Sequence, residues 1–218
     1  MTAREVAESG PAGPGVDVDV LAAERLTFFS DAVVAIAMTL LALDLPVPQG
    51  VTNGEVWASI GQHSGDYVAF LISFIVIGRH WAGHHRLFRY VRGAGGWLVL
   101  WNLLWLLTIV VTPFATRVLT ADGAFETRFT FYAAVQALSG LCFLRMVREL
   151  KVRHLLRPDA PAATLPSAVL QMRMLAAAFL VSIPVAFVTH AAYVCWIAAP
   201  IGAWIARRLA RRHLMPSA

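Results

Sequence analysis

A carboxylate lies inside an apolar run near the start of the chain. Within residues 29–45 the charged side chains are Asp31 and Asp44, and the rest is almost wholly apolar, as in a membrane-spanning helix. A charge near the bilayer centre costs about 2.5–3.5 kcal/mol on insertion scales, so an acid such as Asp31 faces protein, water or a basic partner. Because burial without a partner is costly, we expect Asp31 to be paired. The candidate partners of Asp31 and its neighbour Ser30, in a polar network that holds this helix to others, are Arg25, Arg79 and His84.

Three histidines, His80, His84 and His85, form the second group with potential chemistry. His80 and His84 are four residues apart, the spacing of two metal ligands on one helix face, but no Glu, Asp or Cys nearby completes a site. A metal-binding or redox membrane enzyme is therefore the weaker alternative. The sequence also lacks G-x-S-x-G, H-E-x-x-H and a glycine-rich phosphate loop, so we predict no enzymatic activity and no cofactor. Since histidine titrates near neutral pH, its protonation is a candidate way to tune the protein.

The composition predicts an all-α, polytopic membrane protein. Of the 218 residues, 58% are hydrophobic and 14% charged, and the mean hydropathy is +0.65, which is too apolar for an ordinary soluble domain. The net charge of +5 lies in basic residues between apolar runs, which indicates topology signals rather than a nucleic-acid contact. The two cysteines, Cys142 and Cys195, lie inside apolar segments and predict no disulfide framework. We therefore expect the lipid bilayer as partner and no nucleic acid.

The apolar runs predict six transmembrane helices. They cover approximately 25–45, 57–77, 97–116, 129–144 and 172–206. The last run holds two short spans if the chain turns near His190. We predict a disordered cytoplasmic tail over residues 1–22, because that segment is polar and rich in Gly and Pro. A six-helix transmembrane domain over 23–209 and a short basic tail over 210–218 complete the chain.

The distribution of basic residues favours six spans over five. With the N-terminus in the cytoplasm, six spans place all of the 18 Lys and Arg residues on the cytoplasmic side except Arg117 and Arg128. Five spans would put the four arginines between positions 207 and 212 outside. We therefore predict a multi-pass protein of the cell membrane with both termini in the cytoplasm.

Three motifs resemble those of one channel family. The first apolar run contains R-x-x-x-F-S-D, followed by A-I-A-x-T-L-L and L-D-L-P-V-P; the first motif is formed by Arg25, Phe29, Ser30 and Asp31. Residues 81–88 read W-x-x-H-H-x-L-F, and residues 102–114 begin N-L-L-x-L-L and end Thr-Pro-Phe. These motifs are similar to the first three helices of the TMEM175 potassium channels. That family lacks the T-V-G-Y-G filter, which is also absent from this sequence.

The resemblance implies a homotetramer in which four copies of the first helix surround a pore for potassium ions. It implies that Ile36, Leu40 and Leu43 form the narrowest, apolar part and that Thr39 supplies a hydroxyl layer. An apolar ring gates by dewetting, and partial dehydration gives only a modest preference for potassium. For a membrane helix of unknown family the same stripe would face lipid or a neighbouring helix. A proton-permeable or nonselective cation channel of the same architecture is the second interpretation, and a carrier with alternating access is a third.

The remaining motif residues are expected to build the channel rather than to filter ions. In the simplest interpretation Ser30 bonds to the backbone and Asp31 caps or pairs locally. In the alternative interpretation, Ser30 and Asp31 belong to a polar network that fixes the first helix to its neighbours. The residues assigned to this structural motif and network are Arg25, Phe29, Ser30, Asp31, His84, His85 and Asn102.

Overall fold

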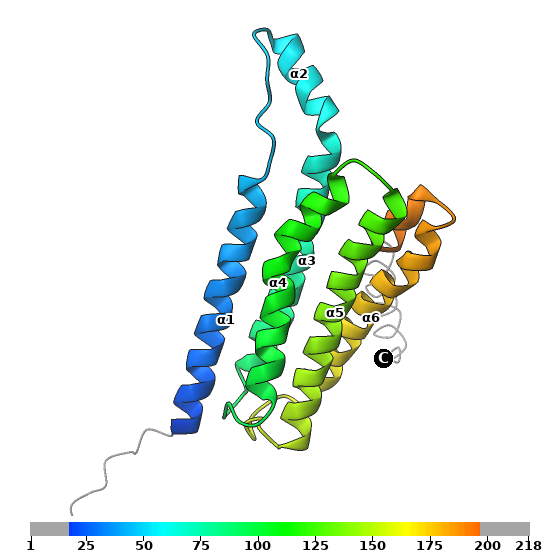
Figure 1. Cartoon of the computed structure of the whole chain (residues 1–218). Coiled ribbons are helices and arrows are strands. Elements are labelled where there is room, and N and C mark those ends of the chain that lie inside the picture. The colour runs from blue at the N-terminus through cyan, green and yellow to red at the C-terminus, as the bar shows by residue number, and fades with distance from the viewer. Residues whose placement is uncertain (1–17, 197–218) are drawn as a thin grey trace, which may run out of the picture.

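The computed structural model describes residues 18–196, and this part of the chain is a bundle of long helices (Figure 1). The helices are α1 (Val18–Leu43), α2 (Asn53–Gln62), α3 (Ser64–Phe88), α4 (Leu98–Thr120), α5 (Phe125–Val152) and α6 (Thr164–Ala186), followed by the 3₁₀-helix η1 (His190–Tyr193). The only β-type pairing among the described residues is an isolated bridge. The predicted all-α class is therefore confirmed.

Residues 18–196 contain four candidate membrane spans, or five if the bent pair of α2 and α3 counts as one span. The helices α1, α4, α5 and α6 are each long and apolar enough to cross a bilayer, and α2 and α3 pass the same test together across a 58° bend. Helices suit this environment because they satisfy every backbone polar group internally. The turn expected near His190 is confirmed, since α6 ends at Ala186 and η1 follows. The predicted sixth span lies outside the described residues, apart from helical residues 194–196.

The two ends of α1 have local causes. The helix begins at Val18, inside the segment 1–22 for which a tail was predicted, and Asp19 in its first turn complements the positive end of the helix dipole. It ends at Leu43, shortly before Pro46 and Pro48, which cannot supply helical N–H donors. The rest of the predicted N-terminal tail and the tail at 210–218 lie outside the described residues.

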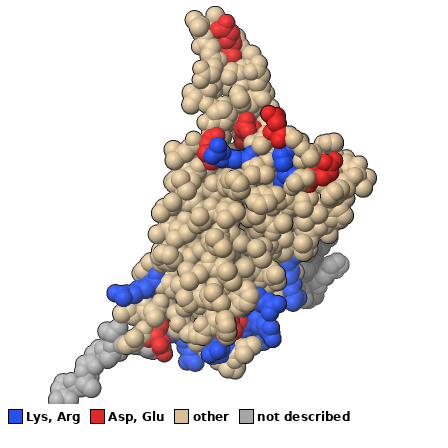
Figure 2. All heavy atoms as spheres, viewed as in Figure 1, with Lys and Arg blue, Asp and Glu red and all other residues tan. Residues whose placement is uncertain are grey.

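Charged side chains gather at the two ends of the bundle and leave an apolar band between them (Figure 2). One end carries the basic residues near the ends of α3 and α5, among them Arg86, Arg89, Arg145, Arg148 and Lys151. The opposite end carries Asp44, Glu55, Asp66, Asp122 and Glu126 together with Arg117 and Arg128. An apolar band with polar ends is the profile of a protein that spans a bilayer.

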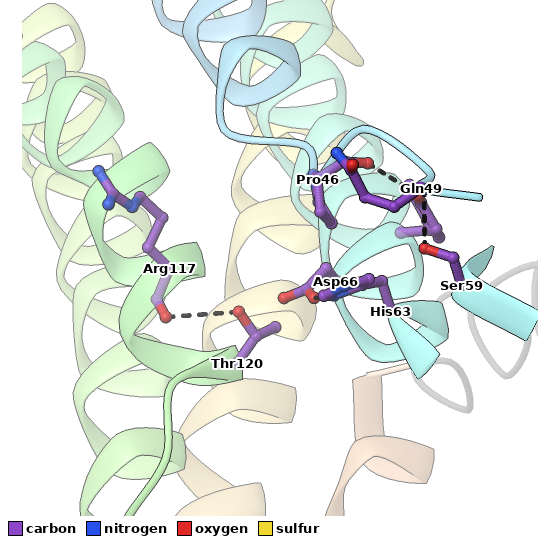
Figure 3. A network of polar contacts seen from close by, with 8 residues as sticks. Pro46, Gln49, Ser59, His63, Asp66, Arg117 and Thr120 are labelled. Atoms are coloured by element: carbon purple, nitrogen blue, oxygen red, sulfur yellow. Dashed lines mark hydrogen bonds and ion pairs between the residues drawn. The ribbon is translucent and has the colours of Figure 1, made fainter. Parts of the chain in front are cut away.

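The bent pair α2 and α3 rises beyond the other helices at the acidic end (Figure 1). A capping box starts α2, because the Thr52 hydroxyl accepts from the Glu55 N–H and the Glu55 carboxylate accepts from the Thr52 N–H. The loop before α2 is tied to both helices: the Gln49 N–H donates to Ser59 Oγ at 3.0 Å, and the Tyr67 hydroxyl donates to the Pro46 carbonyl at 2.8 Å (Figure 3). This loop is therefore held against the bend.

The core lies between α4, α5 and α6, and α1 is an edge helix. Helix α5 packs along both α4 and α6, whereas α1 contacts α3 and α4. The largest fully buried side chains include Trp105, Tyr132, Phe129, Phe143, Phe179 and Met172. By contrast, α1 buries only Ala23, Ser30, Val34, Ala37 and Leu41. The helix that carries the first sequence motif is thus attached to the bundle by one narrow side.

Two connections at the basic end are joined backbone to backbone. The Arg92 N–H donates to the Leu155 carbonyl at 2.9 Å, and the Arg157 N–H donates to the Tyr90 carbonyl at 2.8 Å. These bonds flank the antiparallel bridge between Val91 and Leu156. The α3–α4 connection is thereby fixed to the α5–α6 connection.

Candidate pore helix and its polar anchor

Helix α1 has a packed face and an exposed face. Ser30, Val34, Ala37 and Leu41 follow the i, i+4, i+7 spacing of one helix face and are buried against α3 and α4. Two of them are small, which allows a membrane helix to approach its neighbours closely. Because successive residues are about 100° apart, the side of the helix opposite these four remains uncovered within residues 18–196.

The four residues predicted to form a constriction all lie on the exposed face. Ile36 is 59% exposed, Leu40 40% and Leu43 80%, and Thr39 is also exposed. The Thr39 hydroxyl donates to the Ile36 carbonyl at 2.8 Å, which leaves its oxygen lone pairs free to accept. Phe29, two turns before Ile36, is 50% exposed and extends the same stripe. The structure therefore places the four predicted residues on one exposed face of α1, and no other helix within residues 18–196 covers that face.

Three fully buried side chains connect α1, α4 and α3, and together they form the polar anchor of α1: Ser30, Asn102 and His84. The Ser30 hydroxyl donates to the Leu26 carbonyl at 2.7 Å, and Asn102 Nδ2 donates to Ser30 Oγ at 2.9 Å. Asn102 Oδ1 lies 2.8 Å from His84 Nε2. Ser30 has a single proton, which is already given to Leu26, so Ser30 must accept from the amide nitrogen of Asn102. The amide oxygen then faces His84, whose Nε2 must be the donor.

The ring of His84 is held between two aromatic side chains. It stacks on Phe88 with ring centroids 3.9 Å apart and on Trp105 with centroids 4.5 Å apart and an interplanar angle of 3°. Trp105 comes from α4, so these contacts reinforce the hydrogen bond to Asn102 on the same helix. The prediction that His84 has a packing and hydrogen-bonding role agrees with this geometry.

Asp31 meets two side chains of α3, of which His85 belongs to the predicted polar network and Trp81 does not. Trp81 Nε1 donates to Asp31 Oδ1 at 2.9 Å, and His85 Nδ1 lies 3.5 Å from Asp31 Oδ2. Trp81 and His85 are four residues apart and share the side of α3 that meets Asp31.

Of the three candidate partners of the Ser30 and Asp31 network, the structure brings in His84, which reaches Ser30 through Asn102, but neither arginine. Arg25 is six residues earlier on α1 and therefore points about 120° away from Asp31. His84 is turned toward α4, where it bonds to Asn102. Arg79 is half-buried on α3, two residues before Trp81, and its Nε has no hydrogen-bond partner among the described residues.

His80 and His84 face different helices despite their i, i+4 spacing. His80 is fully buried, and its Nδ1 lies 3.3 Å from the hydroxyl of Ser139 on α5. His84 bonds to α4 instead. Within residues 18–196 no three His, Cys, Asp or Glu side chains are placed to hold a metal ion. The two rings thus serve as separate contacts between helices.

A second group of buried polar side chains was not singled out from the sequence. Ser73 Oγ lies 2.7 Å from Thr116 Oγ1 and 3.0 Å from the Tyr132 hydroxyl, so it joins α3 to α4 and α5. Gln136 Nε2 donates to Thr112 Oγ1 at 3.2 Å. The available signal was a run of threonines every four residues in an apolar helix, at positions 108, 112 and 116. Such hydroxyls often bond only to their own helix, and Thr112 and Thr116 each make such a bond here in addition to the contact with another helix.

The long apolar helices of residues 18–196 and the polar contacts that join them define a polytopic α-helical membrane protein. Residues 25–113 match the family described as endosomal/lysosomal potassium channel TMEM175. The chain is also 37% identical over 146 residues to a potassium channel of Streptomyces collinus, an alignment that covers 64% of this chain and 71% of that protein. This chain belongs to the TMEM175 family.

Two further comparisons show how far the similarity extends. A crystal structure of a lysosomal potassium-selective channel TMEM175 homolog from Chamaesiphon minutus superposes with a TM-score of 0.69 and 28% identity, covering 84% of this chain and 96% of that one. The endosomal/lysosomal proton channel TMEM175 of Rattus norvegicus is 37% identical over 103 residues, which are 44% of this chain and 21% of the rat protein. The family match at 25–113 contains Ser30, Asp31, His84 and Asn102, so it includes the whole polar anchor.

Proposed function

We propose that this chain is one subunit of a homotetrameric potassium leak channel with modest selectivity, in which four copies of α1 surround the pore. The observation that carries the proposal is the exposed apolar stripe of Ile36, Leu40 and Leu43, opposite the packed face of α1. A protein named as a potassium channel and a solved potassium-selective homolog are among its relatives. One chain presents a single α1, so enclosure of a pore requires further copies.

In the proposed pore, selectivity comes from dehydration. Four copies of Ile36, Leu40 and Leu43 would form an apolar constriction that conducts when wetted and closes when dry. A passing cation must shed part of its hydration shell there, and the loss is smaller for potassium because it binds water less tightly than sodium does. The Thr39 hydroxyl, whose lone pairs are free, would replace some of the lost water. Four such oxygens replace fewer waters than a carbonyl filter, so the preference for potassium is modest.

The anchor sets the rotation of α1 about its own axis. Ser30 and Ile36 are six residues apart and therefore lie about 120° apart around the helix. The bonds from Ser30 to Asn102 and on to His84 hold Ser30 toward the bundle. Turning α1 would break them and leave buried polar groups unpaired, at a cost of about 1–3 kcal/mol for each group. The anchor therefore keeps the apolar stripe directed away from the subunit.

We further propose that the chain lies in the cell membrane with both termini in the cytoplasm. The basic end of the bundle collects the connections α3–α4 and α5–α6, whereas the other end carries Arg117 and Arg128 among five acids (Figure 2). Cytoplasmic connections are enriched in Lys and Arg, which assigns the basic end to the cytoplasm. Helix α1 begins at that end (Figure 1), which supports the proposed cytoplasmic side for the N-terminus.

Potassium flux from proteoliposomes containing the full chain tests the proposal. We expect Ile36→Asn to increase flux or reduce selectivity, because an amide in the constriction favours water. The matched control is Leu180→Asn on α6, which makes the same change at a side chain of similar exposure, 56%. Absence of flux in the unaltered protein across a range of voltage and pH would refute the channel. Equal effects of the two substitutions would refute the placement of the pore.

A proton-permeable or nonselective cation channel of the same architecture is the second candidate. The observation that favours it is the relative in rat, which is named a proton channel. Planar-bilayer recording under bi-ionic conditions separates the two. A reversal potential that follows the potassium gradient supports the leak channel, whereas one that follows the pH gradient, or neither gradient, supports the second candidate.

A further inference from the structure

A cleft of about 560 Å³ opens between α1 and α3 at the basic end of the bundle. Helix α1 contributes Val20, Glu24 and Phe28 to its lining, and α3 with the residues that follow contributes Phe88 and Arg89. Arg157 lines it from the α5–α6 connection, where the backbone bond from its N–H to Tyr90 fixes its position. The cleft is thus built by three separate parts of the chain.

The lining of this cleft carries charges of both signs. Glu24 and Arg89 are exposed, and neither forms an ion pair with another residue of the described range 18–196. Arg157 is already held by two hydrogen bonds to Asp159, each 3.0 Å long. Asp31 and His85, which also line the cleft, lie against each other. An acid and a base therefore remain available in one cleft.

The same cleft has an apolar wall that is open to its surroundings. Phe28 is 70% exposed and Val20 is half-buried, and they line the cleft beside Phe88 and Val91, which are themselves buried. A water-soluble zwitterion would leave this surface uncovered. A molecule with a charged head and an apolar body would cover it, and the hydrophobic effect would favour that contact.

The cleft faces away from the proposed pore. Val20, Glu24 and Asp31 are spaced by four and seven residues and share one side of α1. Ile36 is five residues beyond Asp31 and lies about 140° around the helix from it. The cleft also lies where α3 ends, beside Arg86 in its last turn and Arg89 and Arg92 just after it, the depth at which phospholipid headgroups meet a membrane protein.

We propose that this cleft binds a phospholipid whose headgroup carries a primary ammonium, as in phosphatidylethanolamine. The ammonium donates to Glu24, the phosphate accepts from Arg89, and the start of the acyl chains lies along Phe28. Both contacts are charge-assisted hydrogen bonds, and a guanidinium suits the geometry of a phosphate. Phosphatidylglycerol lacks the ammonium, and the quaternary ammonium of phosphatidylcholine has no N–H to donate. The cleft therefore discriminates among phospholipids of the same chain length.

Lipid retention measures this preference without any assay of conduction. The full-length protein is reconstituted with equal amounts of phosphatidylethanolamine, phosphatidylglycerol and phosphatidylcholine of identical acyl chains and then extracted in mild detergent. Mass spectrometry gives the amount of each lipid retained per chain. We expect phosphatidylethanolamine to be enriched about threefold over the other two, the scale of a partly exposed charge pair. Equal retention of the three lipids by the unaltered protein would refute the proposal.

Two substitutions separate the two halves of the headgroup. Glu24→Gln should abolish the enrichment over phosphatidylglycerol, and Arg89→Gln should lower retention of all three lipids. The matched controls are Asp122→Asn and Arg148→Gln, exposed residues outside the cleft that lose the same charges. Effects of the controls as large as those in the cleft would show a response to net charge only and would overturn the site.

A competitor distinguishes the lipid from its soluble headgroup. Glycerophosphoethanolamine carries the same charges without acyl chains. Added at the concentration of the lipid, it should leave retention unchanged, and Phe28→Ser should lower retention because it removes the apolar wall. Displacement by the soluble compound would overturn the assignment to a lipid. Should one variant fail to fold, the comparison of lipids on the unaltered protein still decides the proposal.

Discussion

Helices α1 and α5 are both long and apolar, yet they are attached to the bundle in different ways. Helix α5 lies between α4 and α6 and buries large side chains such as Phe129, Tyr132 and Phe143. Helix α1 lies at the edge and buries mostly small side chains, with Ser30 bonded to Asn102. Shape complementarity therefore holds α5, whereas a few directed hydrogen bonds position α1. Hydropathy alone does not distinguish an embedded helix from one that presents a face to something else.

The largest expected effect is in the core of α5. Phe143→Ala removes a fully buried ring between α5 and its neighbours, and the cavity should lower the free energy of unfolding by about 3 kcal/mol. Leu141→Ala, on the same helix but 48% exposed, is the control and should cost much less. Denaturation in detergent micelles, followed by helical circular dichroism, measures both. Equal losses would mean that α5 is not the embedded helix.

The next effect is at the anchor of α1. Asn102→Leu removes both hydrogen bonds of the amide and leaves the donor of His84 buried without a partner, at a cost of about 2 kcal/mol. The control is Leu103→Ala, at an exposed neighbouring position. Adding Ser30→Ala to Asn102→Leu should cost less than Ser30→Ala does alone, because the two residues share one bond. Strict additivity in this double-mutant cycle would contradict the network.

A smaller effect is expected at the contact between Asp31 and α3. Trp81→Phe keeps the aromatic surface but removes the donor to Asp31, so it should cost about 1 kcal/mol. Trp97→Phe, at an indole that is 60% exposed, serves as the control. In a double-mutant cycle, Trp81→Phe should have less effect when Asp31 is replaced by Ala. An unchanged effect would show that the indole contributes by packing only.

The smallest effect on stability should be on the exposed face of α1. Thr39→Val loses only a bond to the helix's own backbone, so unfolding should change by no more than about 0.5 kcal/mol. If α1 lines a pore, the same substitution should reduce the preference for potassium over sodium in bi-ionic recordings. Thr120→Val, which loses the equivalent i to i−3 bond at the end of α4, should leave that preference unchanged. A selectivity change in both variants would contradict a local role for Thr39.

The sequence predicted the grouping of residues on a helix better than their contacts between helices. Helical periodicity alone places Ile36, Leu40 and Leu43 on one side of α1, and the structure leaves that side exposed. The bond from Trp81 to Asp31 was missed because the rotation of α3 relative to α1 decides whether Trp81 or Arg79 meets the carboxylate. That rotation depends on packing along the whole helix, which no local pattern records.

Three features of the molecule were beyond prediction, each for its own physical reason. The bond between Ser73 and Thr116 joins hydroxyls that are 43 residues apart, and a hydroxyl in an apolar helix bonds equally well to its own backbone. Leu43 is 80% exposed in the single chain, so any group that it contacts in an oligomer comes from another chain. Neither the sequence nor the structure of one chain specifies that contact. The cleft beside Glu24 also depends on how three distant segments meet.

The backbone bridge at the basic end bears on how this protein tolerates sequence change. The bonds from Arg92 to Leu155 and from Arg157 to Tyr90 use main-chain atoms only, so any residue with an amide hydrogen can form them. The side chains at these two positions, 92 and 157, can therefore be substituted while the main-chain bonds keep the helix ends in register. Proline at position 92 or 157 is the exception, because it deletes a donor. The register of the helix ends at this rim therefore depends on main-chain bonds rather than on the identity of residues 92 and 157.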